Sequence, residues 1–197
     1  MSKEVVNIIL AGTGGQGIVL ASRIIAHCAL KSGYEVKESE IHGMAQRGGS
    51  VIGQVRFGKR VFAPTIPVGE GDLMLALEEM EALRYLHYVN PEGVVILNQK
   101  QIVPPALSPE QYPKEVLNRI KAKGYKVLAL KAQDIAQRLG SSKVENSVLL
   151  GVLSLFLPFE LDHWKETIAQ AVPSDMIELN LKAFEEGRAF GEKILSS

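Results

Sequence analysis

A glycine-rich turn that directly follows an apolar run restricts the fold of this chain more than any other feature. Val5–Ala11 lacks the polar alternation of a half-exposed strand. Such a run is typical of a parallel strand that is covered on both faces. The next residues, Gly12–Gly17, read Gly-Thr-Gly-Gly-Gln-Gly, and the apolar spacing after them predicts a helix that begins near Gly15 or Gln16. The order of strand, glycine turn and helix predicts a Rossmann-like α/β domain.

The remainder of the first 140 residues alternates strand-like apolar runs with helical periods. This alternation predicts a three-layer α/β/α fold with a mostly parallel sheet. The further predicted strands are Tyr34–Glu40, Ser50–Phe57, Asp72–Leu77, Val94–Asn98 and Tyr125–Leu130, with Val61–Phe62 as a short hairpin strand. After the first helix, which ends at Gly33, the predicted helices are Glu78–Tyr88, Lys114–Lys123 and Ala132–Leu139.

From Val144 onward the pattern is helical to the end. The predicted helices cover residues 146–157, Asp162–Ala171 and Ser174–Leu195. The first of them is apolar all round, so we expect it to be buried between the sheet and either the tail or another subunit. We expect one domain over residues 1–197, with a helical C-terminal tail at about residues 144–197.

The balance of charge argues against two classes of protein. Lys and Arg total 22, and so do Asp and Glu, whereas nucleic-acid binding needs clustered excess positive charge. The uncharged stretch Asn146–Phe159 is shorter than the about 20 apolar residues that span a bilayer. We therefore expect a cytoplasmic protein that binds neither nucleic acid nor membrane.

The cysteine count restricts the redox chemistry of the chain. Cys28 is the one cysteine, and the four histidines show no close ligand spacing. A [4Fe–4S] cluster takes four thiolates and a structural zinc four Cys or His ligands, so we predict no metal site in this chain. Cys28 is expected to be a small buried hydrophobic residue of the first helix.

The glycine turn is also a candidate cofactor-binding site. Gly12, Gly14 and Gly17 match G-x-G-x-x-G, in which glycines let a ligand approach the backbone and helix amides face an anion. Gly15 and Gln16 complete the candidate set, and the Gln16 side chain can bond a ligand, a partner or its own loop. The alternative is a turn that only lets the helix pack closely on the strand.

Dinucleotide binding also requires an acidic residue for the ribose hydroxyl, about 20 residues after the turn. Glu38 and Glu40 are candidates by distance alone. The acidic run Glu78, Glu79 and Glu81 is expected to be the exposed first turn of a helix, where acidic side chains favour the helix dipole.

A second unusual loop, His42–Gly49, reads His-Gly-Met-Ala-Gln-Arg-Gly-Gly. It follows the predicted strand Tyr34–Glu40 and should emerge at the same carboxyl edge as the glycine turn, where open α/β sheets bind ligands. Arg47, flanked by glycines, can clamp a carboxylate or phosphate, and His42 can titrate near neutral pH. These two are the candidate catalytic residues, and the alternative is an exposed turn with a solvated arginine.

The two loops together resemble a known family. Gly12–Gly17 and the sequence HGMAQRGGSV at His42–Val51 look like the gamma-type domain of the 2-oxoacid:ferredoxin oxidoreductases, and the second loop favours the small (beta) subunit of the indolepyruvate type over the pyruvate type. Asn146–Gly151 is similar to an Asn-x-x-x-x-Gly helix late in that domain. The resemblance therefore spans most of the chain.

This resemblance implies a reaction and a division of labour. A 2-oxoacid such as indolepyruvate or another aryl pyruvate is oxidatively decarboxylated to an acyl-CoA, and electrons pass to ferredoxin. Thiamine diphosphate and the [4Fe–4S] clusters would belong to a large partner subunit. The present chain would be inactive alone, and at its docking edge Arg47 or His42 would help bind an anionic group of the substrate or coenzyme A.

Two other functions stay open at the level of sequence. One is a dinucleotide-binding Rossmann oxidoreductase, which the G-x-G-x-x-G pattern supports. The other is a non-catalytic assembly module in which both loops serve packing and contact alone.

Overall fold

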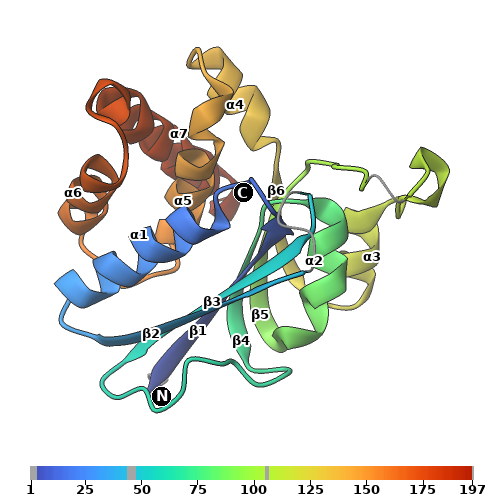
Figure 1. The fold of residues 1–197 in the computed structure, drawn as a ribbon, viewed down its shortest axis with the longest axis horizontal. Helices are drawn as coiled ribbons and strands as arrows, with labels where there is room; N and C mark the ends of the chain where they lie inside the picture. The colour runs from blue at the N-terminus through green and yellow to red at the C-terminus, as the bar shows by residue number, and fades with distance from the viewer. Residues whose placement is uncertain (1–3, 44–47, 105–106, 197) are drawn as a thin grey trace.

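The computed structural model describes residues 4–43, 48–104 and 107–196, and it places one six-stranded sheet between two layers of helices (Figure 1). The strands are β1 (Val5–Thr13), β2 (Glu35–His42), β3 (Ser50–Gly58), β4 (Gly71–Ala76), β5 (Val89–Asn98) and β6 (Lys126–Leu130). The α-helices are α1 (Ile18–Lys31), α2 (Glu79–Tyr85), α3 (Val116–Ala122), α4 (Ala132–Arg138), α5 (Glu145–Ser154), α6 (Leu161–Ala171) and α7 (Ile177–Leu195). Short 3₁₀ helices lie at Leu86–Tyr88, Pro109–Gln111, Ser142–Val144 and Ser174–Met176.

The strand order β2-β3-β1-β4-β5-β6 confirms a mostly parallel sheet, with one exception. Strands β4, β5 and β6 run parallel to β1, whereas β3 is antiparallel to both β1 and β2. The connection Gly43–Gly49 is too short for a crossover helix, and a short connection joins antiparallel neighbours. As expected for the predicted strand–helix–strand unit, β2 runs parallel to β1, but β3 lies between these two strands.

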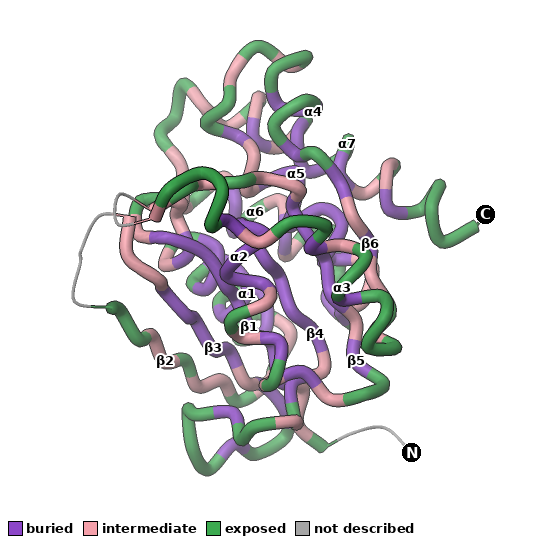
Figure 2. The backbone as a smooth tube through the Cα atoms, turned by 90° about the vertical axis from the view of Figure 1, so that its right-hand side faces the viewer, coloured by how far each residue is buried: buried purple, intermediate pink, exposed green. Residues whose placement is uncertain are grey.

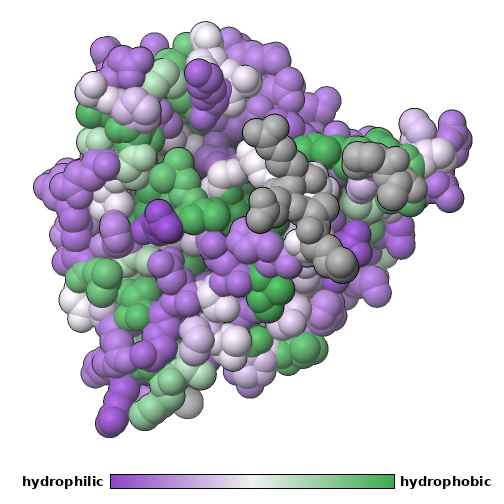
Figure 3. Space-filling model, viewed as in Figure 1, coloured by the Kyte–Doolittle hydropathy of each residue, from purple (hydrophilic) through white to green (hydrophobic). Residues whose placement is uncertain are grey.

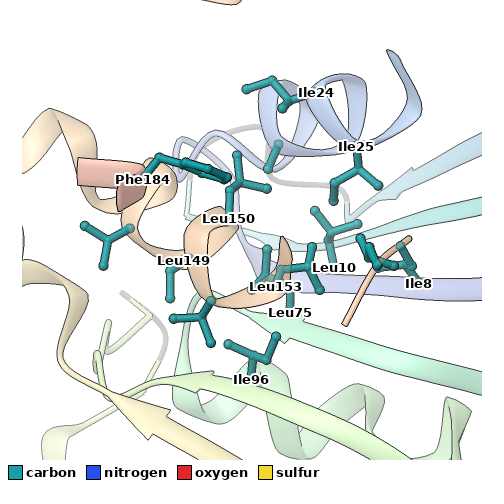
Figure 4. Close-up of a cluster of buried hydrophobic side chains, with 14 of the residues drawn as sticks. Ile8, Leu10, Ile24, Ile25, Leu75, Ile96, Leu149, Leu150, Leu153 and Phe184 are labelled. Atoms are coloured by element: carbon teal, nitrogen blue, oxygen red, sulfur yellow. The ribbon is translucent and has the colours of Figure 1, made fainter. Parts of the chain in front are cut away.

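Each face of the sheet carries its own apolar cluster. Ile8 and Leu10 of β1 point toward α1 and the C-terminal helices, while Ile9 packs with residues of α2 and α3. Figure 4 shows side chains from β1, β4, β5, α1, α5 and α7 converging in the first cluster. This two-sided burial explains why β1 reads as an unbroken apolar run. Figure 2 shows burial falling toward the outer strand β2, where exposed and intermediate residues prevail.

Helix α5 is buried along its length, as the sequence predicts. All residues from Ser147 to Ser154 are buried, and α5 packs against α7. A Cβ atom added at Gly151 would collide with the Phe184 carbonyl oxygen, and one at Gly187 would collide with the Val148 carbonyl oxygen. The two helix backbones therefore cross so closely that only glycine fits at these two positions.

The prediction of a hairpin strand at Val61–Phe62 is wrong. These residues belong to an irregular segment, and side chains of β3 replace the expected strand ladder. Arg56 Nη1 donates to the carbonyl oxygens of Ala63 (3.0 Å) and Thr65 (2.9 Å), which fixes the segment against the sheet.

Two other boundaries differ from the prediction. The helix predicted over Glu78–Tyr88 is α2 followed by the 3₁₀ turn Leu86–Tyr88. The predicted turn Asn90–Gly93 lies inside β5, which begins at Val89 with an irregular register against β4. In the described part of the chain, no helix has both the length and the apolar character needed to cross a membrane.

Candidate functional site

The two glycine-containing loops meet at the carboxyl edge of β1, as predicted. The Gly14 amide donates to the Gly49 carbonyl oxygen (2.8 Å), and the Gly48 amide donates to the Gly14 carbonyl oxygen (3.2 Å). The cause is the antiparallel pairing of β3, which sets Ser50 opposite Thr13 and so brings the preceding loop beside the turn.

The glycine turn is closed by its own glutamine. Gly15 and Gly17 have φ values of 99° and 78°, which L side chains rarely adopt. Gln16 Oε1 accepts hydrogen bonds from the amide and the hydroxyl of Thr13 (2.8 and 3.0 Å). The same oxygen would lie 2.9 Å from a Cβ atom at Gly12. Of the three partners left open by the sequence, Gln16 therefore bonds its own loop.

Amide side chains tie the strand ends together beneath this turn. Gln16 Nε2 and Asn98 Nδ2 both donate to the Leu77 carbonyl oxygen (3.0 and 3.3 Å). Asn98 Oδ1 accepts from the Ala132 amide at the start of α4 (3.1 Å). This chain of contacts links the ends of β1, β4, β5 and β6 into one floor.

Asn146 fastens the turn from above. Its Nδ2 donates to the carbonyl oxygens of Gln16 (2.8 Å) and Gly17 (3.3 Å). A Cβ atom at Gly17 would lie 2.5 Å from this nitrogen. The segment Asn146–Gly151 therefore makes two structural contacts: Asn146 bonds the glycine turn, and Gly151 packs against the backbone of α7.

A cavity of about 450 Å³ opens over this floor. Its walls come from the glycine turn, the second loop, the segment after β5 and the start of α5. The residues used below are Gly14, Gly15, Gln16, Gly48, Asn98, Lys100, Lys143, Glu145 and Asn146. Lys100 Nζ lies 2.8 Å from Glu145 Oε2. Two lysines against one glutamate give these walls a net positive charge, which suits an anionic ligand.

A second cavity of about 390 Å³ adjoins the first, because Lys143 and Asn146 line both. Its other walls are mostly apolar and come from α1, α5 and the segment that joins α6 to α7; they include Leu20, Ile24 and Leu150. Figure 3 shows hydrophobic side chains gathered where α1 faces the C-terminal helices. A ligand with an anionic end and an apolar part can therefore occupy both cavities.

Sequence reasoning missed Asn98, Lys100, Lys143 and Glu145. Asn98 and Lys100 had a usable signal, since polar residues directly after a buried parallel strand lie at the ligand-binding edge. Lys143 and Glu145 had none, because their place depends on how the helical tail packs.

Only some of the candidate residues predicted from the sequence lie in the wall of the first cavity. Gly14, Gly15 and Gln16 line the first cavity, whereas Gly12 and Gly17 shape the turn beneath it. His42 does not line that cavity: it is exposed at the outer strand, with Nε2 3.5 Å from Glu40 Oε2. Arg47 lies outside the described residues.

The geometry weakens the dinucleotide interpretation. The ribose acid belongs on the strand beside β1, but Glu38 and Glu40 lie on β2, with β3 between. The Gly14 amide is also occupied by the Gly49 carbonyl oxygen. Neither glutamate is brought to the glycine turn.

The prediction that Glu78, Glu79 and Glu81 are exposed is wrong, because all three are buried. The Glu78 carboxylate accepts from the amides of Glu81 (2.8 Å) and Ile102 (3.0 Å) and from the Tyr112 hydroxyl. Burial, and then the Glu78 carboxylate, raise the pKa of Tyr112 above its ordinary value.

These partners cap the first turn of α2. The Glu79 amide donates to the Lys100 carbonyl oxygen (3.0 Å), and the Met80 amide donates to Tyr112 Oη (3.1 Å). Since the Glu81 amide bonds Glu78, the first three amides of the helix all have acceptors. The wall that carries Lys100 is thereby fixed to α2.

Cys28 is fully buried, as predicted, and burial raises the pKa of its thiol to about 11. A buried neutral thiol is neither a nucleophile nor a metal ligand. Among residues 4–43, 48–104 and 107–196 there is no group of three or more His, Cys, Asp or Glu side chains placed to hold a metal ion.

Comparison with known proteins gives a consistent picture. Residues 7–190 match the family described as pyruvate ferredoxin/flavodoxin oxidoreductase. The chain is 41% identical over 187 residues to indolepyruvate oxidoreductase subunit IorB of Archaeoglobus fulgidus, covering 92% of each chain. It is 39% identical over 197 residues to the subunit of the same name from Pyrococcus horikoshii, covering 96% of this chain and 98% of that one.

A solved structure shares the fold. The 2-oxoglutarate:ferredoxin oxidoreductase of Magnetococcus marinus, with 2-oxoglutarate, coenzyme A and succinyl-CoA bound, matches with a TM-score of 0.77 at 20% identity. The match covers 98% of the present chain and 32% of that longer chain.

Proposed function

The chain belongs to the pyruvate ferredoxin/flavodoxin oxidoreductase family, and we propose on this basis that it is the small subunit of an enzyme that oxidises an aryl pyruvate such as indolepyruvate. It is a subunit of an oxidoreductase of the 2-oxoacid:ferredoxin type. The choice of indolepyruvate is supported by the names of the two relatives described above and by the loop sequence HGMAQRGG.

The residues of this chain do not fit an iron–sulfur cluster. A [4Fe–4S] cluster takes four thiolates, and the one cysteine, Cys28, is buried. We therefore assign thiamine diphosphate and the clusters to a larger partner subunit, from which electrons pass to ferredoxin. The present subunit is then inactive alone and contributes binding surface to the complex.

The observation that carries the proposal is the cavity at which the two loops meet. Its walls combine Lys100 and Lys143 with the backbone of the glycine turn, next to the apolar second cavity. We propose that this edge docks on the active-site cleft of the partner, and that it binds an anionic group of the 2-oxoacid or of coenzyme A. Of the two candidates in the second loop, we keep Arg47 as a further cation, because His42 does not line the cavity.

The test replaces the loop cation in the reconstituted complex. Arg47→Ala should raise the apparent KM for the 2-oxoacid or for coenzyme A about tenfold, which corresponds to about 1.4 kcal/mol. Arg119→Ala serves as the matched control, because Arg119 is an exposed arginine of α3, on the face of the sheet opposite to α1. Unchanged kinetics in an assembled complex would remove the role of Arg47 and favour a module that serves assembly alone.

A separate titration addresses the dinucleotide alternative. A ligand present at 100 times its Kd stabilises the folded protein by about 2.7 kcal/mol. We expect NAD, NADP and FAD to leave the Tm of the purified chain unchanged, because no acid accompanies the glycine turn on a neighbouring strand. A clear rise in Tm with any of them would restore the dinucleotide function.

A further inference from the structure

An ion pair crosses the first cavity between two separate walls. Lys100 follows β5, and Glu145 is the first residue of α5. Lys100 Nζ donates to both carboxylate oxygens of Glu145, at 3.0 and 2.8 Å. The two side chains are 29% and 12% exposed, so water screens this pair less than an ordinary surface pair.

Both partners are held in place by other contacts. The Lys100 carbonyl oxygen accepts from the Glu79 amide (3.0 Å), and the neighbouring Gln101 side chain donates to Glu79 Oε2 (2.7 Å). Glu145 begins a buried helix whose next residue, Asn146, is bonded to the glycine turn. The pair therefore joins two rigid segments, and the carboxylate stays close to the ammonium.

Building on the proposed function, in which this cavity binds an anionic group, we propose that Glu145 competes with that group for the ammonium of Lys100. A tethered carboxylate acts at a high effective concentration, in the millimolar range or above. A free monocarboxylate offers Lys100 the same chemistry and gains little by exchange. A phosphate group, with more charge and more acceptor oxygens, gains more and therefore displaces Glu145 at a lower concentration.

The experiment measures anion affinity with the competitor removed. Inorganic pyrophosphate and pyruvate are titrated into the purified full chain by calorimetry, for the unaltered protein and for Glu145→Gln. We expect Glu145→Gln to bind each probe about five- to tenfold more tightly, because Lys100 is released. In the unaltered protein, pyrophosphate should bind more tightly than pyruvate.

The chain offers a matched control in the pair of Lys31 with Glu166, whose Nζ–Oε2 distance is 2.7 Å. Glu166→Gln changes the net charge by the same amount at a site between α1 and α6, away from the cavity. It should leave both affinities within about twofold, as expected for an exposed pair. The double variant Lys100→Gln, Glu145→Gln should lose the gain of the single variant.

Three results would overturn the competition. They are equal affinities in Glu145→Gln and Glu166→Gln, a gain that persists without Lys100, and no binding of either anion by any variant. If Glu145→Gln does not fold by circular dichroism, Glu145→Ala, which also removes the carboxylate, replaces it under the same criteria. The proposed function is judged separately, by the KM of the Arg47→Ala complex.

Discussion

The side-chain amide of Asn146 donates a 2.8 Å hydrogen bond to the carbonyl oxygen of Gln16, which precedes it by 130 residues. This bond ties the glycine turn to the first turn of α5 at the wall of the cavity. The first two predictions follow from it.

Asn146→Ala should lower the free energy of unfolding by about 1–2 kcal/mol, because two partly buried carbonyl oxygens lose their donor. Urea unfolding followed by circular dichroism measures the loss. Asn118→Ala, an exposed asparagine of α3, is the control and should change stability by less than about 0.5 kcal/mol. Equal effects at both positions would contradict a structural role for the Asn146 bond.

Gly17→Ala should cost about 2–4 kcal/mol, because the residue has a φ of 78° and its new Cβ would meet Asn146 Nδ2. The same substitution should cost less in the Asn146→Ala background, where the steric conflict is gone and only backbone strain remains. A double-mutant cycle by urea unfolding measures this coupling. Strictly additive effects would show that the Asn146 side chain does not collide with the added methyl group at residue 17.

The crossing of α5 and α7 predicts a graded response to added methyl groups. Gly151→Ala and Gly187→Ala place Cβ against backbone carbonyl oxygens and should each cost about 3 kcal/mol or more. Gly191→Ala, on the same helix α7, meets the flexible end of Leu155 and should cost less than half as much. Thermal unfolding orders the three variants, and equal losses would argue against the close crossing.

The buried carboxylate of Glu78 predicts a large effect from a nearly isosteric change. Glu78→Gln should destabilise the protein by about 2–4 kcal/mol, because an amide cannot accept from all three donors. Tyr112→Phe removes one donor to Glu78 and the acceptor of the Met80 amide, and should cost about 1–3 kcal/mol. Urea unfolding measures both, and a neutral Glu78→Gln would mean that the carboxylate is not needed as an ion.

The thiol of Cys28 predicts an alkaline weakness. Its pKa is about 11 when folded and 9.0 in the ordinary state, so above pH 9 the unfolded chain binds fewer protons than the folded one. This contribution is therefore fully present below pH 9, and it falls by up to about 1.4 kcal/mol per pH unit until the folded thiol ionises.

Urea unfolding at pH 8 and pH 10 measures this dependence in the unaltered protein and in Cys28→Ala. Other titrating groups are common to both proteins, so the difference between their slopes isolates the thiol. The variant should lose less stability between the two pH values. Identical slopes would show that the thiol ionises as freely in the folded state as in the unfolded one.

Local sequence was enough to predict the elements whose apolar pattern is set by the sheet. Val5–Ala11 and Asp72–Leu77 are apolar because helices cover both faces, and both match observed strands within two residues at each end. The antiparallel course of β3 was missed because strand direction depends on the length of the connection. Val61–Phe62 failed because Arg56, a side chain, takes the place of a strand partner.

The site was predictable only where its features depend on residues that are close in the sequence. The meeting of the two loops followed from strand direction, whereas the role of Gln16 depends on Leu77, 61 residues away. The burial of Glu78 depends on Tyr112, 34 residues away, and helical position alone made this acidic run look exposed. Long-range partners decide which polar residues are buried, and a short window of sequence does not contain them.

Strands β2 and β3 form an antiparallel hairpin, and Gly43, Gly48 and Gly49 hold the ends of its connection by backbone hydrogen bonds. A hairpin tip can change in length and composition without changing the order of strands or the packing of helices. A change of length or composition in this connection should therefore leave the glycine turn and the core in place.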